Sequence, residues 1–560
     1  MRTIKIQRGL ALGMLALVRS LAAGGIARGQ EFTVPRYEVF EVALTSSKDY
    51  ANPFLGVTVT GTFTSPTGRK LVAYGFYDGN KTWRIRLAPD GIGVWSYVTQ
   101  SSDPENEGLR SREGTFRCLP ASNRGFIRPS PIRPYVLSYD DSTPFFALGD
   151  TCPVTSKGLS DANRKAYLDA RAGKPFNFVR TFASLTFNAW TGKPWSERIS
   201  KDPDGFPWGG TPEAPDYDRL NPAYFQRYEK ILGELKERGV HAEIVVYNLY
   251  EIPFKIPADW TRAREELWGR YVVSRLSADP TVLMWTVAQE FERYPDGQYR
   301  HAPTDDDWVR RMAKLIREAD PHRHPVTVHP WGRTPGAKGE DDVEGGRIGA
   351  RFGPGRELDV LCHQHNSYGT AIWVPDPAPG YWDGSGAGVE KAIWADRKFG
   401  KPVLNTEYGY GWSKDYPTHI NNQAHGTDKC RRAAWRIFTA GGAGLAAGFI
   451  GTFMGHDHAD VYFADKKESA PFVLEEMGHA KELSYLHDFV TKRIRFVEMN
   501  PAQTLVNAPN LCLANPGQEY VVYAPAGGEV TLDLSHARGD FAVAWMNPRT
   551  GVFQAAGSVA

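Results

Sequence analysis

Two short apolar runs that each carry a glutamate decide the expected fold. The run VLMWTVAQE at positions 282–290 ends in Glu290, and the run PVLNTEYG at positions 402–409 carries Glu407. Runs of this length and polarity are typical of strands buried in a parallel sheet. In a chain that alternates strands and helices, carboxylates at strand ends lie at the reactive rim of a β/α barrel. Two carboxylates are also the minimum equipment for breaking a glycosidic bond.

The alternation extends on both sides of these runs. Asn221-Pro222 predicts a helix start, with an N-cap followed by proline at the first helical position, and Gly239 predicts its end. The eight expected strands are 145–148, 176–181, 240–247, 282–290, 326–329, 358–362, 402–409 and 445–450. Strands separated by helices form parallel βαβ units, and eight of them predict a closed (β/α)8 barrel. A doubly wound open sheet is the rival, but no phosphate-binding glycine-rich turn follows the first strand.

The flanking segments have a different texture. Residues 31–120 and 501–560 alternate apolar and polar positions between regular turn signals, which predicts antiparallel β-sandwiches. We therefore expect a leader over 1–30, an immunoglobulin-like sandwich over 31–120, the barrel over 125–495 and a small sandwich over 501–560. The chain stops soon after Phe553, which leaves open whether the last module lacks a strand.

Composition limits the partners. The chain has 66 basic and 64 acidic residues, and this balance argues against nucleic acid or a polybasic membrane contact. Its five cysteines are scattered, without CxxC spacing or a disulfide framework. Aromatic residues make up 12% of the chain, and flat aromatic faces suit both a core and a sugar site. We expect a carbohydrate partner, no cofactor and no metal, and the sequence does not give the oligomeric state.

The N-terminus has the pattern of an export signal. Arg2, Lys5 and Arg8 precede the apolar run 10–18, and small residues follow at 22–25. The run is too short to span a membrane. We therefore expect a periplasmic or extracellular protein.

Specific motifs add family resemblances at both ends of the chain. The stretches NP at 52–53, GTF at 61–63, GFYDG at 75–79, WRIR at 83–86 and GVWSY at 93–97 resemble the immunoglobulin-like DUF5060 domain that precedes many glycoside hydrolase barrels. The stretches ANPG at 514–517, YVVY at 520–523 and WMNPRTG at 545–551 resemble a module named for collagen binding. No His-Glu-x-x-His motif occurs, so this name does not imply a zinc protease.

Residues 125–495 resemble the DUF4038-like and family-5-like barrels of the retaining glycoside hydrolases called clan A. This resemblance implies that Glu290, after the fourth strand, is the acid/base and that Glu407, on the seventh strand, is the nucleophile. The clan has asparagine before the acid/base, where it often holds the sugar 2-hydroxyl, and Gln289 stands there in this chain. Glutamine makes the same bonds on a longer arm, so the departure affects the sugar more than the chemistry.

The same resemblance implies support for the nucleophile. Arg180 on the second strand matches the arginine that hydrogen-bonds the nucleophile, and His365 and Tyr368 match a His/Tyr pair beside it. The strand-eight tryptophan of the clan is not evident, and Phe453 lies near its position. Further candidates for substrate contact follow strands at the rim: Gln289, Trp190, Asn188, Tyr247, Asn248, His329 and Trp331.

The mechanism needs one protonated and one ionised carboxyl. An arginine near Glu407 would keep it ionised, and apolar walls such as Trp285 or Phe291 would favour protonated Glu290. Glu292 and Glu251 are rival carboxylates at the same rim, and we expect them to contact substrate or support the site.

Two other functions remain open from the sequence. His363-Gln364-His365 and His456-Asp457-His458 each place two imidazoles on one face of an extended segment, as a metal-dependent barrel hydrolase could use. Metal barrels of the amidohydrolase type carry their His-x-His pair on the first strand, however, and the strand-end glutamates would then have no role. A non-catalytic carbohydrate-binding protein on the same scaffold is the third possibility.

Overall fold

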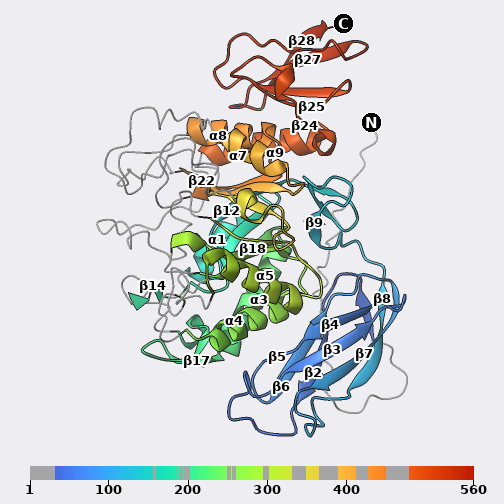
Figure 1. The fold of residues 1–560 in the computed structure, drawn as a ribbon, viewed down its shortest axis with the longest axis vertical. Helices are drawn as coiled ribbons and strands as arrows, with labels where there is room; N and C mark the ends of the chain where they lie inside the picture. The colour runs from blue at the N-terminus through green and yellow to red at the C-terminus, as the bar shows by residue number, and fades with distance from the viewer. Residues whose placement is uncertain are drawn as a thin grey trace, which may run out of the picture.

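The computed structural model describes residues 32–155, 159–185, 187–188, 193–194, 202–248, 254, 260–293, 302–330, 348–364, 389–411, 427–449 and 478–559. Three parts of the chain follow one another in space (Figure 1). The N-terminal sheets lie against one side of a central barrel, and the C-terminal sheets lie beyond helices α7, α8 and α9. The expected fold class, a β/α barrel between two β-domains, is therefore confirmed.

Eight parallel strands form the barrel. They are β12 (Ala147–Thr151), β13 (Phe178–Phe182), β18 (His241–Tyr247), β19 (Val282–Ala288), β20 (Val326–Thr327), β21 (Leu361–His363), β22 (Val403–Gly411) and β23 (Gly444–Phe449). Pairing of β12 with β23 joins the first strand to the last. Over their described residues, β20 and β21 are not paired as strands, and individual hydrogen bonds close the ring between them. Asp359 N donates to Val326 O at 2.8 Å, and Thr327 Oγ1 donates to Val360 O at 2.8 Å.

The helices that surround the barrel begin at polar caps. Ser160, Asn221, Thr261 and Thr304 each accept a hydrogen bond from a backbone N–H of the first turn. The helices are α1 (Asp161–Asp169), α3 (Pro222–Lys236), α4 (Arg262–Leu276), α5 (Asp305–Ala319), α6 (Ile348–Phe352), α7 (Val389–Arg397), α8 (Thr427–Thr439) and α9 (Gly478–Lys492). Between β13 and α3 lie two hairpins, β14 (Phe187–Asn188) with β15 (Lys193–Pro194) and β16 (Trp208–Thr211) with β17 (Ala214–Leu220).

A small sheet closes the N-terminal end of the barrel, which we call the floor. It consists of β9 (Ile127–Pro129), β10 (Leu137–Tyr139) and β11 (Pro144–Phe145). Ile127, Leu137 and Phe145 pack with interior residues such as Met284 and Leu404 in one apolar cluster. The first barrel strand therefore begins at Ala147, and not at residue 145 as expected, because Phe145 pairs with Leu137 in the floor sheet.

The N-terminal domain has two sheets around its own core. One has the order β1-β8-β7-β3-β4 and the other β2-β6-β5. Its strands are β1 (Thr33–Pro35), β2 (Phe40–Thr45), β3 (Val59–Thr64), β4 (Lys70–Tyr74), β5 (Phe76–Tyr77), β6 (Thr82–Leu87), β7 (Gly93–Ser101) and β8 (Glu113–Leu119). Arg86 binds Glu229 of α3 at 2.7 Å and Asp78 binds Arg275 of α4 at 2.7 Å, so buried ion pairs join this domain to the outer helices of the barrel.

The C-terminal part also packs on the helices of the barrel. It contains β24 (Asn500–Pro501), β25 (Leu511–Asn515), β26 (Glu519–Tyr523), β27 (Phe541–Met546) and β28 (Phe553–Val559). Tyr523 stacks on Trp435 of α8, and Phe553 stacks on Phe489 of α9. All five cysteines are buried and unbridged. Across the described residues, no helix has both the length and the apolar character that a bilayer crossing requires.

Candidate active site

The first glutamate lies just beyond its strand. β19 ends at Ala288, and Gln289 and Glu290 follow directly at the C-terminal rim of the barrel. Glu290 is only 6% exposed and has a φ of +41°. A positive φ is costly for a residue with a Cβ, and such strain concentrates at functional sites. The backbone thus turns sharply where the carboxylate must point inward.

The second glutamate lies within its strand, since β22 continues beyond it to Gly411. The pairing of β22 with β23 changes register between Asn405 and Tyr408, and Glu407 falls in this irregular stretch. Its backbone N–H donates to Asn405 Oδ1 at 3.3 Å. Register breaks of this kind re-aim side chains near active sites. Glu407 is 2% exposed.

One amide joins the two carboxylates. Gln364 follows β21, and its Nε2 donates to Glu290 Oε1 at 2.7 Å and to Glu407 Oε1 at 3.0 Å. These two oxygens therefore lie no further apart than the sum of the two lengths. Glutamates from the fourth and seventh barrel strands thus face each other across a single amide group.

Arg180 supplies positive charge beneath Glu407. Its Nη1 donates to Glu407 Oε2 at 3.0 Å, and its Nε lies 3.5 Å from Glu243 Oε1. Thr286 Oγ1 donates to the same Glu243 oxygen at 2.6 Å. Arg180 and Glu243 are fully buried. Burial raises the pKa of Glu243, and the guanidinium opposes this rise. One arginine thus serves two carboxylates, with Glu407 above and Glu243 on the neighbouring strand.

Two neutral side chains complete the surroundings of Glu407. Gln289 Nε2 donates to Glu407 Oε2 at 3.3 Å. His329 Nε2 lies 3.5 Å from the same oxygen. Burial, and then the nearby charge of Arg180, hold the pKa of His329 well below its usual range, so its imidazole is neutral at physiological pH. The positive charge next to Glu407 therefore comes from Arg180.

The other predicted residues have different placements. His365, Tyr368, Trp190 and Trp331 lie outside the described residues, as do Phe453 and Glu251. Asn188 lies in β14, where only the backbone is described. Their suggested roles stay predictions.

Tyr247 and Asn248 are buried beside the barrel wall. Tyr247 Oη donates to the carbonyl of Glu265 in α4 at 2.9 Å, so its ring packs between the strand and the helix layer. Asn248 Nδ2 donates to Ser184 O at 3.3 Å. These contacts tie the wall together, and the suggested sugar contacts of the two residues stay predictions.

Trp285, one of the two residues expected to form an apolar wall around Glu290, has another location. Trp285 Nε1 donates to Asp320 Oδ2 at 3.0 Å, and its ring packs against His324. Side chains alternate along a strand, so Trp285 faces the helix layer while Thr286 faces the interior. Trp285 therefore does not line the Glu290 carboxyl. The rival Glu292 accepts a hydrogen bond from Arg351 of α6 at 2.7 Å.

Gln364, Glu243 and Asn405 are the site residues that the sequence did not single out. Gln364 lies inside the His363-Gln364-His365 stretch, where the histidines drew attention to metals. His363 Nε2 lies 2.8 Å from Asp396 Oδ2 of α7, so the histidine turns outward while Gln364 turns inward. Among the residues that the structure describes, no group of three or more His, Cys, Asp or Glu side chains could hold a metal ion. Strand alternation around position 363 was the signal that could have separated the two side chains.

Three family models match the chain. Residues 133–469 match "Apiosidase-like, catalytic domain", residues 33–102 match the DUF5060 domain of unknown function, and residues 501–560 match a collagen-binding-like domain. The resemblances found at both ends of the sequence are thereby confirmed. No match was found among curated proteins.

Solved structures share the fold at low sequence identity. A candidate glycoside hydrolase from Bacteroides vulgatus ATCC 8482 has 21% identity and a TM-score of 0.60 over 86% of this chain and 84% of its own. A family 5 glycoside hydrolase from the same organism has 17% identity and a TM-score of 0.58 over 78% of this chain and 88% of its own.

Proposed function

The chain belongs to the family of apiosidase-like catalytic domains, and this membership makes it a glycosidase. We propose that it cleaves O-glycosidic bonds of an oligo- or polysaccharide and that the product retains the anomeric configuration of the substrate. The observation that carries the mechanism is the amide bridge of Gln364 between Glu290 and Glu407. Retaining enzymes hold their two carboxyls about 5–5.5 Å apart, and inverting enzymes about 6.5–9.5 Å apart. The bridge, with bonds of 2.7 and 3.0 Å, limits the separation of its two oxygens to less than the inverting range.

We assign Glu407 as the nucleophile. The Arg180 guanidinium and the amides of Gln289 and Gln364 all donate to its oxygens. Donors of this kind stabilise a carboxylate and not a carboxylic acid. Glu290 is the other carboxyl of the bridged pair, and we assign it the proton that the leaving oxygen needs.

The proposed reaction has two displacements. Glu290 donates its proton to the leaving oxygen while Glu407 attacks the anomeric carbon, which breaks the glycosidic bond and forms a glycosyl ester. Glu290 then removes a proton from water, and the water oxygen attacks the same carbon and releases Glu407. Each inversion at carbon cancels the other, so the product keeps the starting configuration.

Gln364 has to yield when substrate binds. Its amide nitrogen lies within hydrogen-bond reach of both carboxylates, and the reacting bond must occupy the same gap. We propose that Gln364 keeps the carboxylates apart in the free enzyme and moves to a substrate hydroxyl in the complex. Gln289 is suited to a second hydroxyl, because its Nε2 is used by Glu407 while its Oε1 has no hydrogen-bond partner within the described part of the chain.

The test is hydrolysis of a panel of aryl glycosides and polysaccharides that includes a β-apioside, since the family is named for that sugar. Glu407→Ala is expected to lower kcat by about 10⁴-fold or more, and azide should restore turnover in one of the two glutamate variants as a glycosyl azide. Glu290→Ala should lower the rate most for substrates with poor leaving groups, since these need the proton.

The matched control is Glu292→Gln, a carboxylate at the same rim that accepts a hydrogen bond from Arg351 of α6 at 2.7 Å. It should keep near-normal turnover. Full activity in Glu407→Ala and Glu290→Ala would contradict the proposal, and sensitivity to a chelator would then favour a metal-dependent hydrolase.

We also propose that the protein is exported, on the basis of the basic and apolar pattern of its first 25 residues. Cell fractionation and N-terminal sequencing of the full-length product test this. Recovery from the cytoplasm with an intact N-terminus would contradict it.

A further inference from the structure

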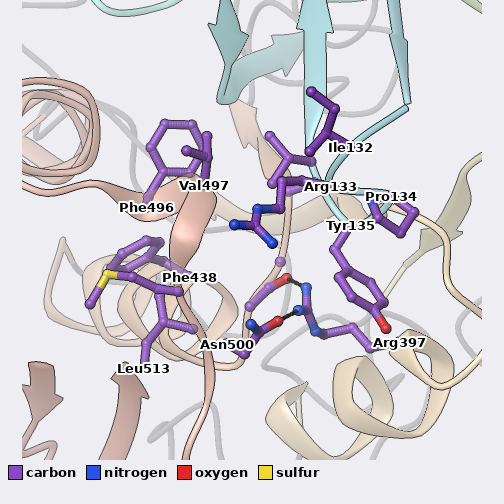
Figure 2. Close-up of a pocket in the computed structure, with 15 residues that line it drawn as sticks. Ile132, Arg133, Pro134, Tyr135, Arg397, Phe438, Phe496, Val497, Asn500 and Leu513 are labelled. Carbon is purple, nitrogen blue, oxygen red and sulfur yellow. Dashed lines mark hydrogen bonds between the residues drawn. The ribbon is translucent and has the colours of Figure 1, made fainter. Parts of the chain in front are cut away.

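A pocket lies at the floor of the barrel, at the opposite end from Glu290 and Glu407. Its walls come from the loop before β10, from residues 441–443 before β23, and from residues 496–500 that lead into the C-terminal sheets. The cavity has a volume of about 100 Å³. Figure 2 shows how these three segments surround it.

Arg397, the last residue of α7, forms one side of the pocket. Only 9% of its surface is exposed. Its Nη1 donates to Gly441 O at 2.7 Å, its Nη2 donates to Asn500 Oδ1 at 3.0 Å, and its guanidinium lies 4.0 Å from the ring centre of Tyr135. All of these partners are neutral. Burial accordingly lowers the pKa of Arg397 to about 10, the direction expected for a cation that is not paired with a carboxylate.

Arg133 approaches from the opposite wall. Figure 2 shows its side chain reaching from the loop toward the space above the guanidinium of Arg397. Arg133 is exposed, and within the described residues its side chain has no hydrogen-bonding or ion-pair partner. Two positive groups therefore face the same small space.

No acidic side chain offsets these charges among the described residues that line the pocket. The other lining residues are mostly apolar, among them Ile132, Pro134, Phe438 and Leu513. A buried arginine without a counter-charge is costly, and like charges that face each other add to this cost. An anion between the two guanidinium groups would remove both penalties.

The backbone of the floor is shaped around Arg397. Gly441 has a φ of +83°, and a Cβ at this position would lie 3.0 Å from the guanidinium. A larger residue is therefore disfavoured both by conformation and by contact. The carbonyl of the same glycine accepts a bond from Arg397, so glycine allows the close approach that fixes the guanidinium.

We propose that this pocket binds a small organic anion through a carboxylate held between Arg133 and Arg397. The planar fork of an arginine matches the two oxygens of a carboxylate, and the apolar walls favour a short hydrocarbon group over a fully hydrated ion. Because the pocket is made from both the barrel and the residues that enter the C-terminal sheets, the bound anion would join these two parts.

The first experiment is saturation-transfer NMR of propionate with the full chain. Propionate should receive saturation from the wild-type protein, and Arg133→Gln should weaken its binding by about tenfold, as for loss of one charge-assisted hydrogen bond. The matched control is Arg110→Gln, an exposed arginine of the N-terminal domain, which should bind propionate normally.

The second experiment places the carboxylate on the chain itself. In Arg133→Glu the new side chain should pair with Arg397, so propionate binding should be lost while the thermal midpoint rises by about 1–2 °C relative to Arg133→Gln. Equal propionate binding in wild type, Arg133→Gln and Arg133→Glu would overturn the proposal, as would no binding to any of them. Binding of inorganic phosphate in place of propionate would overturn the choice of a carboxylate.

Discussion

At the rim of the barrel, buried Arg180 lies between Glu407 and Glu243, whereas the contacts of buried Arg397 at the floor are all with neutral groups within the described residues. The same residue type thus has two electrostatic settings in one domain. At the rim the positive charge of Arg180 is matched by two carboxylates of the protein, one of which is the proposed nucleophile. At the floor the charge is left for a ligand to match. Burial alone does not distinguish the two arginines. The comparison indicates that the presence or absence of protein carboxylates beside a buried arginine distinguishes a role in the active site from a role in ligand binding.

Among the changes that test this comparison, the largest effect is expected from removal of the rim charge. Arg180→Gln keeps an amide donor but leaves two buried carboxylates without their cation, and breaking such a pair typically costs about 3–5 kcal/mol. We expect kcat/KM to fall by about 10³-fold, measured on the best substrate of the panel. Circular dichroism checks that the variant is folded, and Arg110→Gln is the matched surface control. A folded Arg180→Gln enzyme with normal activity would show that the rim does not need its charge balance.

A smaller effect is expected at the amide bridge. Gln364→Leu removes both hydrogen bonds and retains most of the side-chain volume, so the two carboxylates lose the group that separates them. We expect a loss of about 10–100-fold in kcat/KM, together with a shifted pH profile, because the glutamates then interact directly. An unchanged pH profile would contradict the proposed role of Gln364 in separating the two carboxylates.

A change at Glu243 tests how the charge of Arg180 is shared between Glu243 and Glu407. Glu243→Gln keeps the shape and leaves the whole guanidinium charge to Glu407, and we expect a loss of only about tenfold in kcat. Because burial raises the pKa of Glu243 in the folded state, its neutral form favours folding. The wild type should therefore lose stability as the pH rises from the unfolded value of a glutamate through the raised one, while the variant should lack this loss. Thermal midpoints across this pH range provide the measurement, and parallel curves for the two proteins would contradict it.

The last prediction concerns stability and a buried histidine at the floor. His322 Nε2 accepts a hydrogen bond from the backbone N–H of Ala88 at 2.9 Å, which links the barrel to the N-terminal domain. Burial lowers the pKa of His322 to about 3. Asp320 and Asp90 favour the charged imidazole, while Arg128 and His324 oppose it.

A depressed pKa in the folded state gives stability that is present above the unfolded value and is lost as the pH falls. Between pH 7.5 and pH 5 we therefore expect His322 to cost wild type roughly 2 kcal/mol, by the usual value per pKa unit. His322→Gln keeps an acceptor for Ala88 and should lose less stability over this range. Equal losses, measured by thermal unfolding at both pH values, would contradict this role.

The sequence predicted the eight strands of a closed barrel because buried parallel strands are short apolar runs between capped helices. It also predicted that Arg180 would contact Glu407, and the structure contains that hydrogen bond at 3.0 Å. Gln364 could not be selected in the same way, because it depends on which face of a three-residue strand turns inward. The floor pocket could not be predicted from the sequence either, because Arg133, Arg397 and Asn500 are far apart in the chain and come together only after folding.

The most direct test of the account is the configuration of the first sugar released. Proton NMR distinguishes a retaining from an inverting mechanism when an anomerically pure substrate is hydrolysed and the product is recorded before mutarotation. The close pair formed by Glu290 and Glu407 predicts that the product first appears with the configuration of the substrate. First appearance of the opposite anomer would contradict the double displacement and the nucleophilic role of Glu407.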